Sequence, residues 1–436
     1  MLNYIERALR FQRIHGTRRL LSEALLRVRR RLAGSPRAAA PGLLSDDSGW
    51  VSARDMVRKH AQHCTPLRLF SVPRAELGRI TLVTDSINRG SLYGGVGTSA
   101  IFAALLARAR GQRLRILTRT ERANPGGLQT VLDSNGITLQ HEVEFAFAPF
   151  YDDKYEVDAF ADELFITTSW WTTAATLATV PVERVVYLLQ EDERMFYAYG
   201  DEHLRCARTL AHPGLRYVIN TRLLFDHLVA SGLPQVAERG MWFEPAFPPD
   251  VFKPLPREAG AKRQLLFYAR PNNARNLFYL GLEVLEGAID RGVVDLDQWD
   301  VVFVGKDIPK LRLDGGRYTP RRLENLDWKQ YAQLAGTTDL ALCLMYTPHP
   351  SYPPFDLAAS GAVVVTNRFA NKQSLAAYCA NILCADPEPQ ALVQALADGV
   401  QLALDAPARE ANRRAAQLGT TWEAAFADVV ARVAAG

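Results

Sequence analysis

Two blocks of apolar strands that alternate with helix-prone segments constrain the fold of this chain more than any other feature. The first block starts near Arg79 and runs to about residue 220, and the second starts at Gln264 and runs to about residue 366. Consecutive parallel strands need a long crossover, usually a helix, so this alternation is typical of doubly wound sheets. The predicted fold class is α/β, with two Rossmann-like parallel-sheet domains that face each other across a cleft.

Apolar runs, and glycines that end helices, predict the positions of helices and strands. In the first block we expect a helix over 98–110 and strands at 80–84, 114–118, 137–139, 164–167, 185–189 and 217–220. In the second block we expect strands at 264–268, 301–305, 340–345 and 363–366. A short helix is expected to start near Phe355, and residues 389–434 are almost wholly helix-prone.

The Pro-rich segment 244–254 separates the two blocks. A chain of 436 residues can hold two domains that each bury a core. We expect a helical extension and linker over residues 1–75, a first domain over 76–253 and a second domain over 254–420.

The expected extension is strongly basic. Residues 1–37 carry ten arginines against two carboxylates, which leaves the remainder of the chain net negative. A uniformly basic nucleic-acid binder is therefore not expected. An apolar stripe over residues 21–32 either docks on an anionic membrane surface or packs on the protein itself, and its lack of aromatic residues favours packing.

Cysteine and histidine usage predicts no metal site. The five cysteines are scattered, without zinc-like spacing, and the eight histidines form no metal-binding motif. Reduced, buried thiols are expected, which suits the cytoplasm. No apolar stretch reaches membrane-spanning length, and the N-terminus does not resemble a secretory signal.

A glycine-rich loop lies between the first strand and its helix. Gly94, Gly95 and Gly97 would let a ligand approach the backbone closely, and Thr98 or Ser99 could cap the helix. The alternative is a flexible turn without function.

Two arginines follow the first strand of the second block. Arg270 and Arg275 are suited to phosphate because a guanidinium offers fixed, bidentate donors, and Lys306 follows the next strand. We expect this pair to bind a diphosphate at the carboxyl edge of the sheet and to stabilise it as it departs.

The loop 346–354 leads into the short helix expected near Phe355. Its N-terminus is a candidate anion site whose donors would be the N–H groups of Phe355, Asp356 and Leu357. The Asp356 carboxylate would either accept hydrogen bonds from ribose hydroxyls or only complement the helix dipole. His349, Ser351 and Tyr352 are candidate ligand contacts, with loop packing as the alternative for the two rings.

An acidic run follows the strand 185–189. Glu191 or Asp192 could orient an acceptor hydroxyl or act as a base, on a surface shared with Tyr93 and Gln190. The alternative is a solvated charged loop.

These motifs together resemble the GT-B glycosyltransferases of retaining family 4, over residues 79–435. The resemblance rests on Arg270 and Arg275 five residues apart, on Asp356 five residues before Gly361, on the crossing 250–254 and on the glycine loop. It implies that the arginines grip a diphosphate, that Asp356 binds ribose, and that the C-terminal helix, 421–436, joins the first domain. One departure is clear, because the first glutamate of the family's two-glutamate motif would fall at Pro348.

The runs 346–356 and 267–276 are more specifically similar to the WsaF family of rhamnosyltransferases and its rhamnan-synthesis relatives. The resemblance implies dTDP-β-L-rhamnose as the donor substrate, retention of configuration, and no cofactor or metal. It also implies a glycan or lipid-linked glycan acceptor on a growing bacterial surface polysaccharide.

We therefore expect a cytoplasmic glycosyltransferase, either free or held at the inner face of the membrane through residues 1–33. Two alternatives stay open. A catalytically silent module would bind glycan without nucleotide, and a sugar-nucleotide epimerase of the same fold would act without an acceptor.

Overall fold

The computed structural model describes residues 51–74, 76–88, 94–152, 154–258 and 260–435. The expectations for residues 1–50 and for Tyr93 lie outside these ranges and stay predictions. The chain forms two compact units, one up to His60 and one from Ala61 onward. In the first unit the structure describes helix α3 (Ala53–His60), and everything below concerns the second unit.

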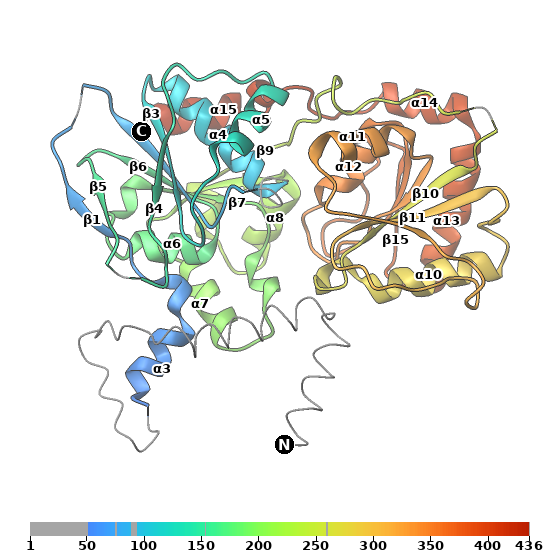
Figure 1. The fold of residues 1–436 in the computed structure, drawn as a ribbon, viewed down its shortest axis with the longest axis horizontal. Coiled ribbons are helices and arrows are strands. Elements are labelled where there is room, and N and C mark those ends of the chain that lie inside the picture. The colour runs from blue at the N-terminus through green and yellow to red at the C-terminus, as the bar shows by residue number, and fades with distance from the viewer. Residues whose placement is uncertain (1–50, 75, 89–93, 153, 259, 436) are drawn as a thin grey trace, which may run out of the picture. The chain divides into compact units, whose positions relative to one another are not determined.

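A seven-stranded parallel sheet forms the first lobe of this unit, in the order β4-β3-β2-β6-β7-β8-β9 (Figure 1). Its strands are β2 (Arg79–Thr84), β3 (Arg113–Thr118), β4 (Glu144–Phe147), β6 (Leu164–Thr167), β7 (Val185–Leu189), β8 (Arg216–Asn220) and β9 (Gly240–Phe243). Strands β1 (Arg68–Ser71) and β5 (Glu156–Ala159) pair separately, also in parallel. The helices are α4 (Gly95–Ala109), α5 (Pro125–Ser134), α6 (Trp170–Leu177), α7 (Asp201–Leu210), α8 (Arg222–Ala230) and α9 (Gln235–Arg239).

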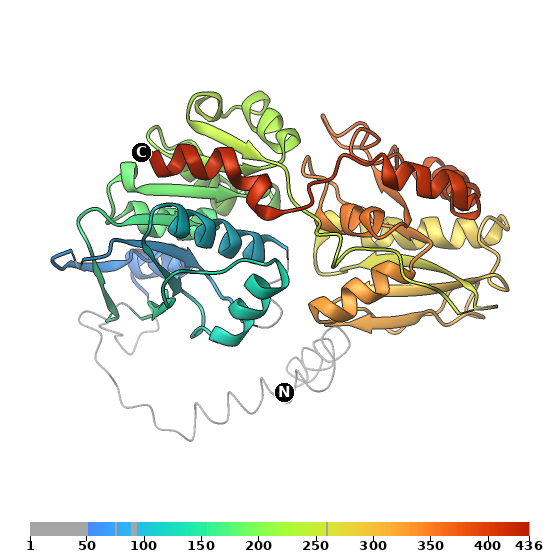
Figure 2. The same cartoon turned by 90° about the horizontal axis from the view of Figure 1, so that it is seen from above.

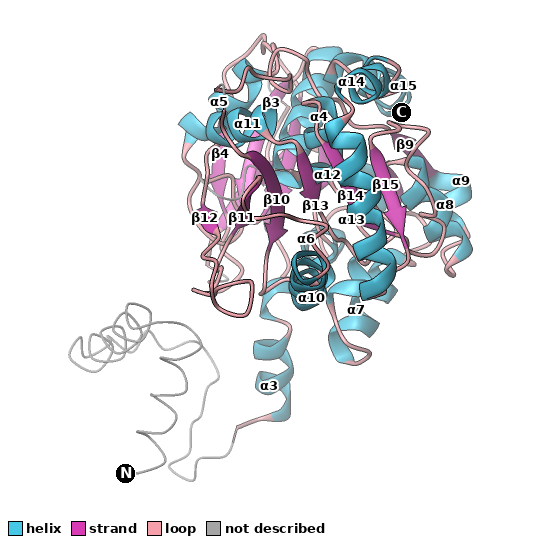
Figure 3. Cartoon of the chain, turned by 90° about the vertical axis from the view of Figure 1, so that its right-hand side faces the viewer, coloured by secondary structure: helices cyan, strands magenta, loops and turns pink. Residues whose placement is uncertain are grey.

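A six-stranded parallel sheet forms the second lobe, in the order β12-β11-β10-β13-β14-β15. Its strands are β10 (Arg263–Ala269), β11 (Trp299–Gly305), β12 (Arg321–Glu324), β13 (Leu340–Leu342), β14 (Val363–Asn367) and β15 (Ile382–Ala385). Helices α10 (Phe278–Asp290) and α13 (Pro389–Leu404) lie against each other on one face of this sheet (Figure 3). Helices α11 (Trp328–Thr337) and α12 (Tyr352–Ala359) cover the other face, and α14 (Ala406–Arg414) follows α13.

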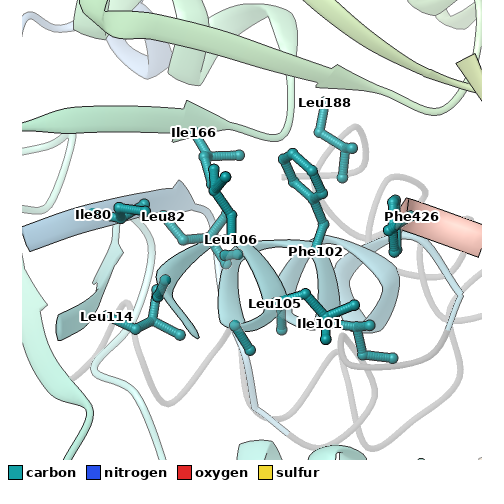
Figure 4. Close-up of a cluster of buried hydrophobic side chains, with 14 of the residues drawn as sticks. Ile80, Leu82, Ile101, Phe102, Leu105, Leu106, Leu114, Ile166, Leu188 and Phe426 are labelled. Carbon is teal, nitrogen blue, oxygen red and sulfur yellow. The ribbon is translucent and has the colours of Figure 1, made fainter. Parts of the chain in front are cut away.

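Each sheet has a buried core on both faces, because alternate residues of a strand point to opposite sides. In β2, Ile80 and Leu82 pack under α4, whereas Val83 packs on the α6–α8 side. Figure 4 shows Ile80, Leu82 and Ile166 directed toward the apolar side chains of α4. The expected pair of doubly wound parallel sheets is therefore confirmed.

The last helix, α15 (Trp422–Ala435), packs on the first lobe (Figure 2). Its Phe426 ring lies 5.1 Å from that of Phe102 on α4 and 4.3 Å from that of Phe243 on β9. The chain thus crosses between lobes twice, and the two crossings are bonded where the Phe247 N–H donates to the Gly419 carbonyl at 2.7 Å.

The strand expected at 137–139 is wrong. This segment is a loop in which Ile137 is buried under the first sheet, and the strand nearby is β4 at Glu144–Phe147. The expected central strands are present, although β13 ends at Leu342, three residues before the expected end at Met345. Among the described residues, no helix combines the length and apolarity needed to cross a membrane.

Candidate functional site

The carboxyl ends of the two sheets meet at Tyr352, the first residue of α12. Its hydroxyl lies 2.7 Å from Oγ1 of Thr98, 2.8 Å from Nδ2 of Asn220 and 3.2 Å from Oε1 of Gln190. Those three partners belong to the first lobe, whereas Tyr352 belongs to the second. The structure therefore brings the expected loop 346–354 and the expected glycine loop together.

The glycine loop opens helix α4. Gly94 has φ +66° at the N-cap, a conformation that favours glycine, and its Cα faces the Tyr352 ring. Gly95 and Gly97 are the first and third residues of the helix, and the amide of Gln190 donates to the Gly95 carbonyl. The helix starts three residues before the expected residue 98, so Thr98 and Ser99 do not cap it. Their hydroxyls instead donate to the carbonyls of Gly94 and Gly95.

Glu191 follows β7 and contacts the second lobe. The Thr347 hydroxyl donates to its Oε2 at 2.9 Å, and Nη1 of Arg275 lies 3.7 Å from the same oxygen. Burial raises the pKa of Glu191 to about 7, although Arg275 and the Thr347 bond act in the opposite direction. A carboxyl group with such a pKa can exchange a proton near neutral pH.

Asp192 is held differently from Glu191, by contacts that favour its ionised form. It is buried at the N-cap of the 3₁₀ helix η3 (Glu193–Phe196), where Nε and Nη2 of Arg194 donate to its two oxygens at 2.8 and 2.7 Å. Despite burial, hydrogen bonds from His227 and Arg194 lower its pKa to about 2. A carboxylate so strongly held in its ionised form is a poor proton acceptor.

Glu193 is a residue that the sequence reasoning missed. It is 4% exposed and accepts the Trp170 N–H at 2.8 Å, and burial raises its pKa to about 8. The expected alternative of a solvated loop is wrong for this run, because all three acidic residues are buried.

Arg275 reaches across to the first lobe. Its guanidinium carbon lies 3.9 Å from the centre of the Phe196 ring, and its Nε donates to Oδ1 of Asn273 at 3.2 Å. Burial lowers its pKa, although Glu191 favours the charged form. Arg275 is thus held between lobes at the carboxyl edge of the second sheet.

Arg270 follows β10 and is half-buried beside the Tyr268 hydroxyl. In the part of the chain that the structure describes, no carboxylate forms an ion pair with it. Lys306 follows β11 with an exposed side chain, and its N–H donates to the Ala269 carbonyl at 3.4 Å. Arg270 and Lys306 therefore lie directly after two neighbouring strands of the second sheet.

The start of α12 corrects the expected anion site. The helix begins at Tyr352, so the Phe355 N–H already closes the first helical turn, and those of Asp356 and Leu357 continue it. Ser351, at φ +71°, donates its N–H to Nδ1 of His349, and two prolines follow Tyr352. The three N–H groups expected to bind an anion therefore lie at the fourth to sixth positions of the helix rather than at its open end. Phe355 and Leu357 are core residues.

His349 is buried and neutral. Because its Nδ1 accepts the Ser351 N–H, the ring hydrogen is placed on Nε2. Burial, with the charges of Lys372 and Arg275, lowers the pKa of His349 to about 3. Its Nε2 is buried without a hydrogen-bond partner among the described residues.

Asp356 faces a cavity of about 430 Å³ lined by both lobes. The first lobe contributes Gly94, Gly97 and Trp422, and the second contributes Tyr352, Asp356 and Trp328. Burial raises the pKa of Asp356 well above its usual value, and the Tyr331 hydroxyl lies beside it. The cavity thus combines aromatic rings, glycine backbone and a polar group able to take hydroxyl partners.

Comparisons with known proteins agree with this geometry. The model of the WsaF N-terminal domain matches residues 79–222, and that of the WsaF C-terminal domain matches residues 263–397. Together the two matches span more than half of the chain. The chain belongs to the WsaF family.

A curated relative is the O-antigen biosynthesis protein RfbC of Myxococcus xanthus, 27% identical over 349 residues. The match covers 77% of this chain but 25% of RfbC, so the chain spans about a quarter of the length of that relative.

Solved structures share the fold. WaaG, a glycosyltransferase involved in lipopolysaccharide biosynthesis, has a TM-score of 0.57 at 13% identity, over 82% of this chain and all of WaaG. The sucrose-phosphate synthase of Thermosynechococcus elongatus has a TM-score of 0.55 at 13% identity, over 81% of this chain and 97% of that one. Anabaena Alr3699/HepE, solved with UDP and glucose, has a TM-score of 0.55 at 14% identity, over 82% and 97%. The fold of this WsaF-family chain is GT-B.

Lys372 is a site residue that the sequence reasoning did not name. It lies beyond β14, fully buried, and its Nζ donates to the Met345 carbonyl at 2.7 Å. The sequence could have indicated Lys372, because it follows an expected strand and residues after parallel strands gather at the carboxyl edge of a sheet. Among the described residues, no group of three or more His, Cys, Asp or Glu side chains is placed to hold a metal ion.

Proposed function

We propose that this WsaF-family chain is a glycosyltransferase that moves a sugar from a nucleotide donor onto a growing bacterial polysaccharide. The supporting observation is that the carboxyl edges of both sheets meet, with Tyr352 bonded to Thr98 and Asn220 and with Arg275 facing Glu191. RfbC, named for O-antigen biosynthesis, supports the product class. By family resemblance, we propose dTDP-β-L-rhamnose as the donor and a glycan or lipid-linked glycan as the acceptor.

In this proposal the nucleoside occupies the cavity, where the Asp356 carboxyl meets the ribose hydroxyls. Arg270 and Arg275 neutralise the diphosphate as the bond between the sugar and the phosphate oxygen breaks. Charge stabilisation of this kind is commonly a large part of catalysis, and it requires no metal here. The new bond forms between the sugar and an acceptor hydroxyl, with retention of configuration.

The acceptor's proton needs a group that can take it. Glu191 is the better candidate of the acidic run, because its pKa is about 7. Asp192 is the weaker candidate, because Arg194 favours its ionised form. We place the reaction in the cytoplasm, where nucleotide sugars are made.

The test is a transfer assay with dTDP-β-L-rhamnose and a rhamnan oligosaccharide. We expect Arg270→Ala to lower kcat/KM by roughly a hundredfold or more, the usual size of losing one charge-stabilising group. Arg291→Ala is the control, since Arg291 is exposed at the end of α10 that lies away from the carboxyl edge. Melting temperatures verify that both variants fold.

Each other result has a definite meaning. Turnover by Arg270→Ala at the wild-type rate would overturn the diphosphate assignment. Glycan binding without transfer would identify a silent binding module, and conversion of donor without acceptor would identify an epimerase.

A further inference from the structure

The bond between Thr347 and Glu191 joins the two lobes inside the proposed site. One Glu191 oxygen faces the second lobe, with the Thr347 hydroxyl at 2.9 Å and the Arg275 guanidinium at 3.7 Å. The other accepts the N–H of Asp192 at 3.1 Å within the first lobe. The loop from Tyr346 to Phe355 contains no carboxylate of its own, so Glu191 supplies the negative charge there.

Lys372 adds a second buried cation to this group. Burial lowers its pKa to about 8, and the charge of Glu191 acts to raise it again. An ammonium group has three hydrogens to donate, and among the described residues the Nζ of Lys372 donates to the Met345 carbonyl alone. Two cations, Arg275 and Lys372, therefore share the charge of one carboxylate.

His349 supplies an independent sign that an anion belongs here. Its side chain is 4% exposed, and its Nε2 carries a hydrogen without an acceptor among the described residues. Burying an unpaired donor costs free energy, which a partner would recover. Both Lys372 and Arg275 act on the charge of this ring, so it lies in the same cationic environment.

We propose that Glu191 takes the place of an anion in the ligand-free protein and latches the two lobes, and that a diphosphate at Arg275 and Lys372 displaces it. This inference rests on the proposed function, in which Arg275 faces the donor diphosphate. Displacement would couple donor binding to the release of Glu191. The released carboxylate would then be free to serve the acceptor hydroxyl.

The latch should weaken as pH falls, because protonation of Glu191 near pH 7 removes the charge that competes with the ligand. Ionisable and charged groups from four loops and from β15 act on the cluster: Asp192, Glu193 and Tyr197, Arg270 and Arg275, His349, Lys372, and Cys384. Of these, His349 and Asp192 hold one charge state from pH 5.5 to 8. Glu193 and Lys372 titrate toward the upper end of this range, so each needs its own variant as a reference.

The experiment is calorimetric titration of the full chain with inorganic pyrophosphate at pH 8 and pH 5.5. At pH 8 we expect Glu191→Gln to bind roughly two- to fivefold tighter than wild type, in line with the modest strength of a single ion pair at 3.7 Å. Thr347→Val, which keeps every cation, should also bind tighter. At pH 5.5 the ratio of the pyrophosphate affinities of Glu191→Gln and wild type should approach one.

Three variants sharpen the comparison. Lys372→Met should bind pyrophosphate more weakly, whereas Glu193→Gln and Glu244→Gln should match wild type. Glu244 is a matched control because burial also raises its pKa while its partner is the Arg222 N–H. Thermal unfolding verifies that each variant folds.

Equal or weaker binding by Glu191→Gln at pH 8 would overturn the latch, as would a Lys372→Met variant with unchanged affinity. The proposed function fails by a different observation, namely no transfer and no nucleotide-sugar binding by wild type. Pyrophosphate reports on the latch in either case, because it needs no sugar or base.

Discussion

Three consecutive acidic residues after β7 show how strongly local partners set the behaviour of a side chain. The pKa of Glu191 is about 7, that of Asp192 about 2, and that of Glu193 about 8. Burial opposes the charge of all three, but Arg194 and His227 overcome it at Asp192 alone. Residue type and order could not reveal this difference, because the deciding partners are distant in sequence or belong to turns that the sequence does not specify.

Glu193 makes stability depend on pH. Its pKa in the folded protein is raised from the usual 4.5 to about 8, so the stability it contributes is fully present below pH 4.5 and is lost as pH rises through 8. A difference of one bound proton between the folded and unfolded states changes the free energy of unfolding by about 1.4 kcal/mol per pH unit. Glu193 should therefore lower the free energy of unfolding of wild type by roughly 2 kcal/mol between pH 6 and 8. We expect Glu193→Gln to lose less free energy of unfolding over this interval in urea titrations.

Asp192→Asn provides the reference of opposite sign. The stability from Asp192 is present above pH 4 and lost as pH falls through 2, so this variant should leave the slope between pH 6 and 8 unchanged. If Glu193→Gln and wild type lose equal free energy over that interval, Glu193 is not protonated in the folded protein.

At the scale of elements, central strands were predictable and edge strands were not. Strand β7 is a continuous apolar run and β2 and β11 are mostly apolar, because both of their faces are covered by helices. Edge strands β4 and β12 contain glutamate and arginine and are only partly buried, so they lack that signal. The early start of α12 was also hidden, since two prolines in its first turn suggested a loop.

The packing of α10 on β10 depends on a glycine. A Cβ on Gly281 would lie 2.3 Å from the Phe267 ring, which is fully buried and cannot move away. We expect Gly281→Ala to lower the free energy of unfolding by roughly 1–3 kcal/mol, the usual cost of overpacking a core. Chemical denaturation followed by circular dichroism measures this change.

Gly287 on the same helix is the control. A Cβ there would meet Val393 at 3.4 Å, an ordinary contact. Alanine also favours the helix by about 1 kcal/mol, so Gly287→Ala should be neutral or stabilising. A Gly281→Ala variant as stable as Gly287→Ala would show that α10 and β10 are less closely packed.

At the scale of the whole molecule, the lobes are joined by two crossings of the chain and by side-chain contacts at Tyr352 and Glu191. The sequence marked the first crossing by its prolines, whereas the return of α15 was implied by resemblance. The pattern of an amphipathic helix predicts that it packs on the protein, but it does not indicate on which surface. The contacts of Phe426 with Phe102 and Phe243 could therefore be seen only in the structure. Arg270 and Arg275 were proposed from the sequence because phosphate chemistry restricts the side chains that can bind it, and the structure places both after β10.

The contacts between lobes at Tyr352 and Glu191 were beyond sequence reasoning. Tyr352 meets Thr98, 254 positions away, and Thr347 meets Glu191, 156 positions away. Nothing in either local segment specifies such a partner. The sequence therefore predicted which edges carry the chemistry, and the structure added how the edges meet.

The central claim is that the site binds a nucleotide sugar, and thermal unfolding with dTDP-, UDP- and GDP-sugars tests it most directly. Ligand at a hundred times its Kd stabilises by about 2.7 kcal/mol, so for a chain of 436 residues we expect dTDP-rhamnose to raise the Tm of wild type by about 3 °C. The same ligand should leave the Tm of Arg270→Ala nearly unchanged. If no nucleotide sugar raises the Tm of wild type, the account of this site is contradicted.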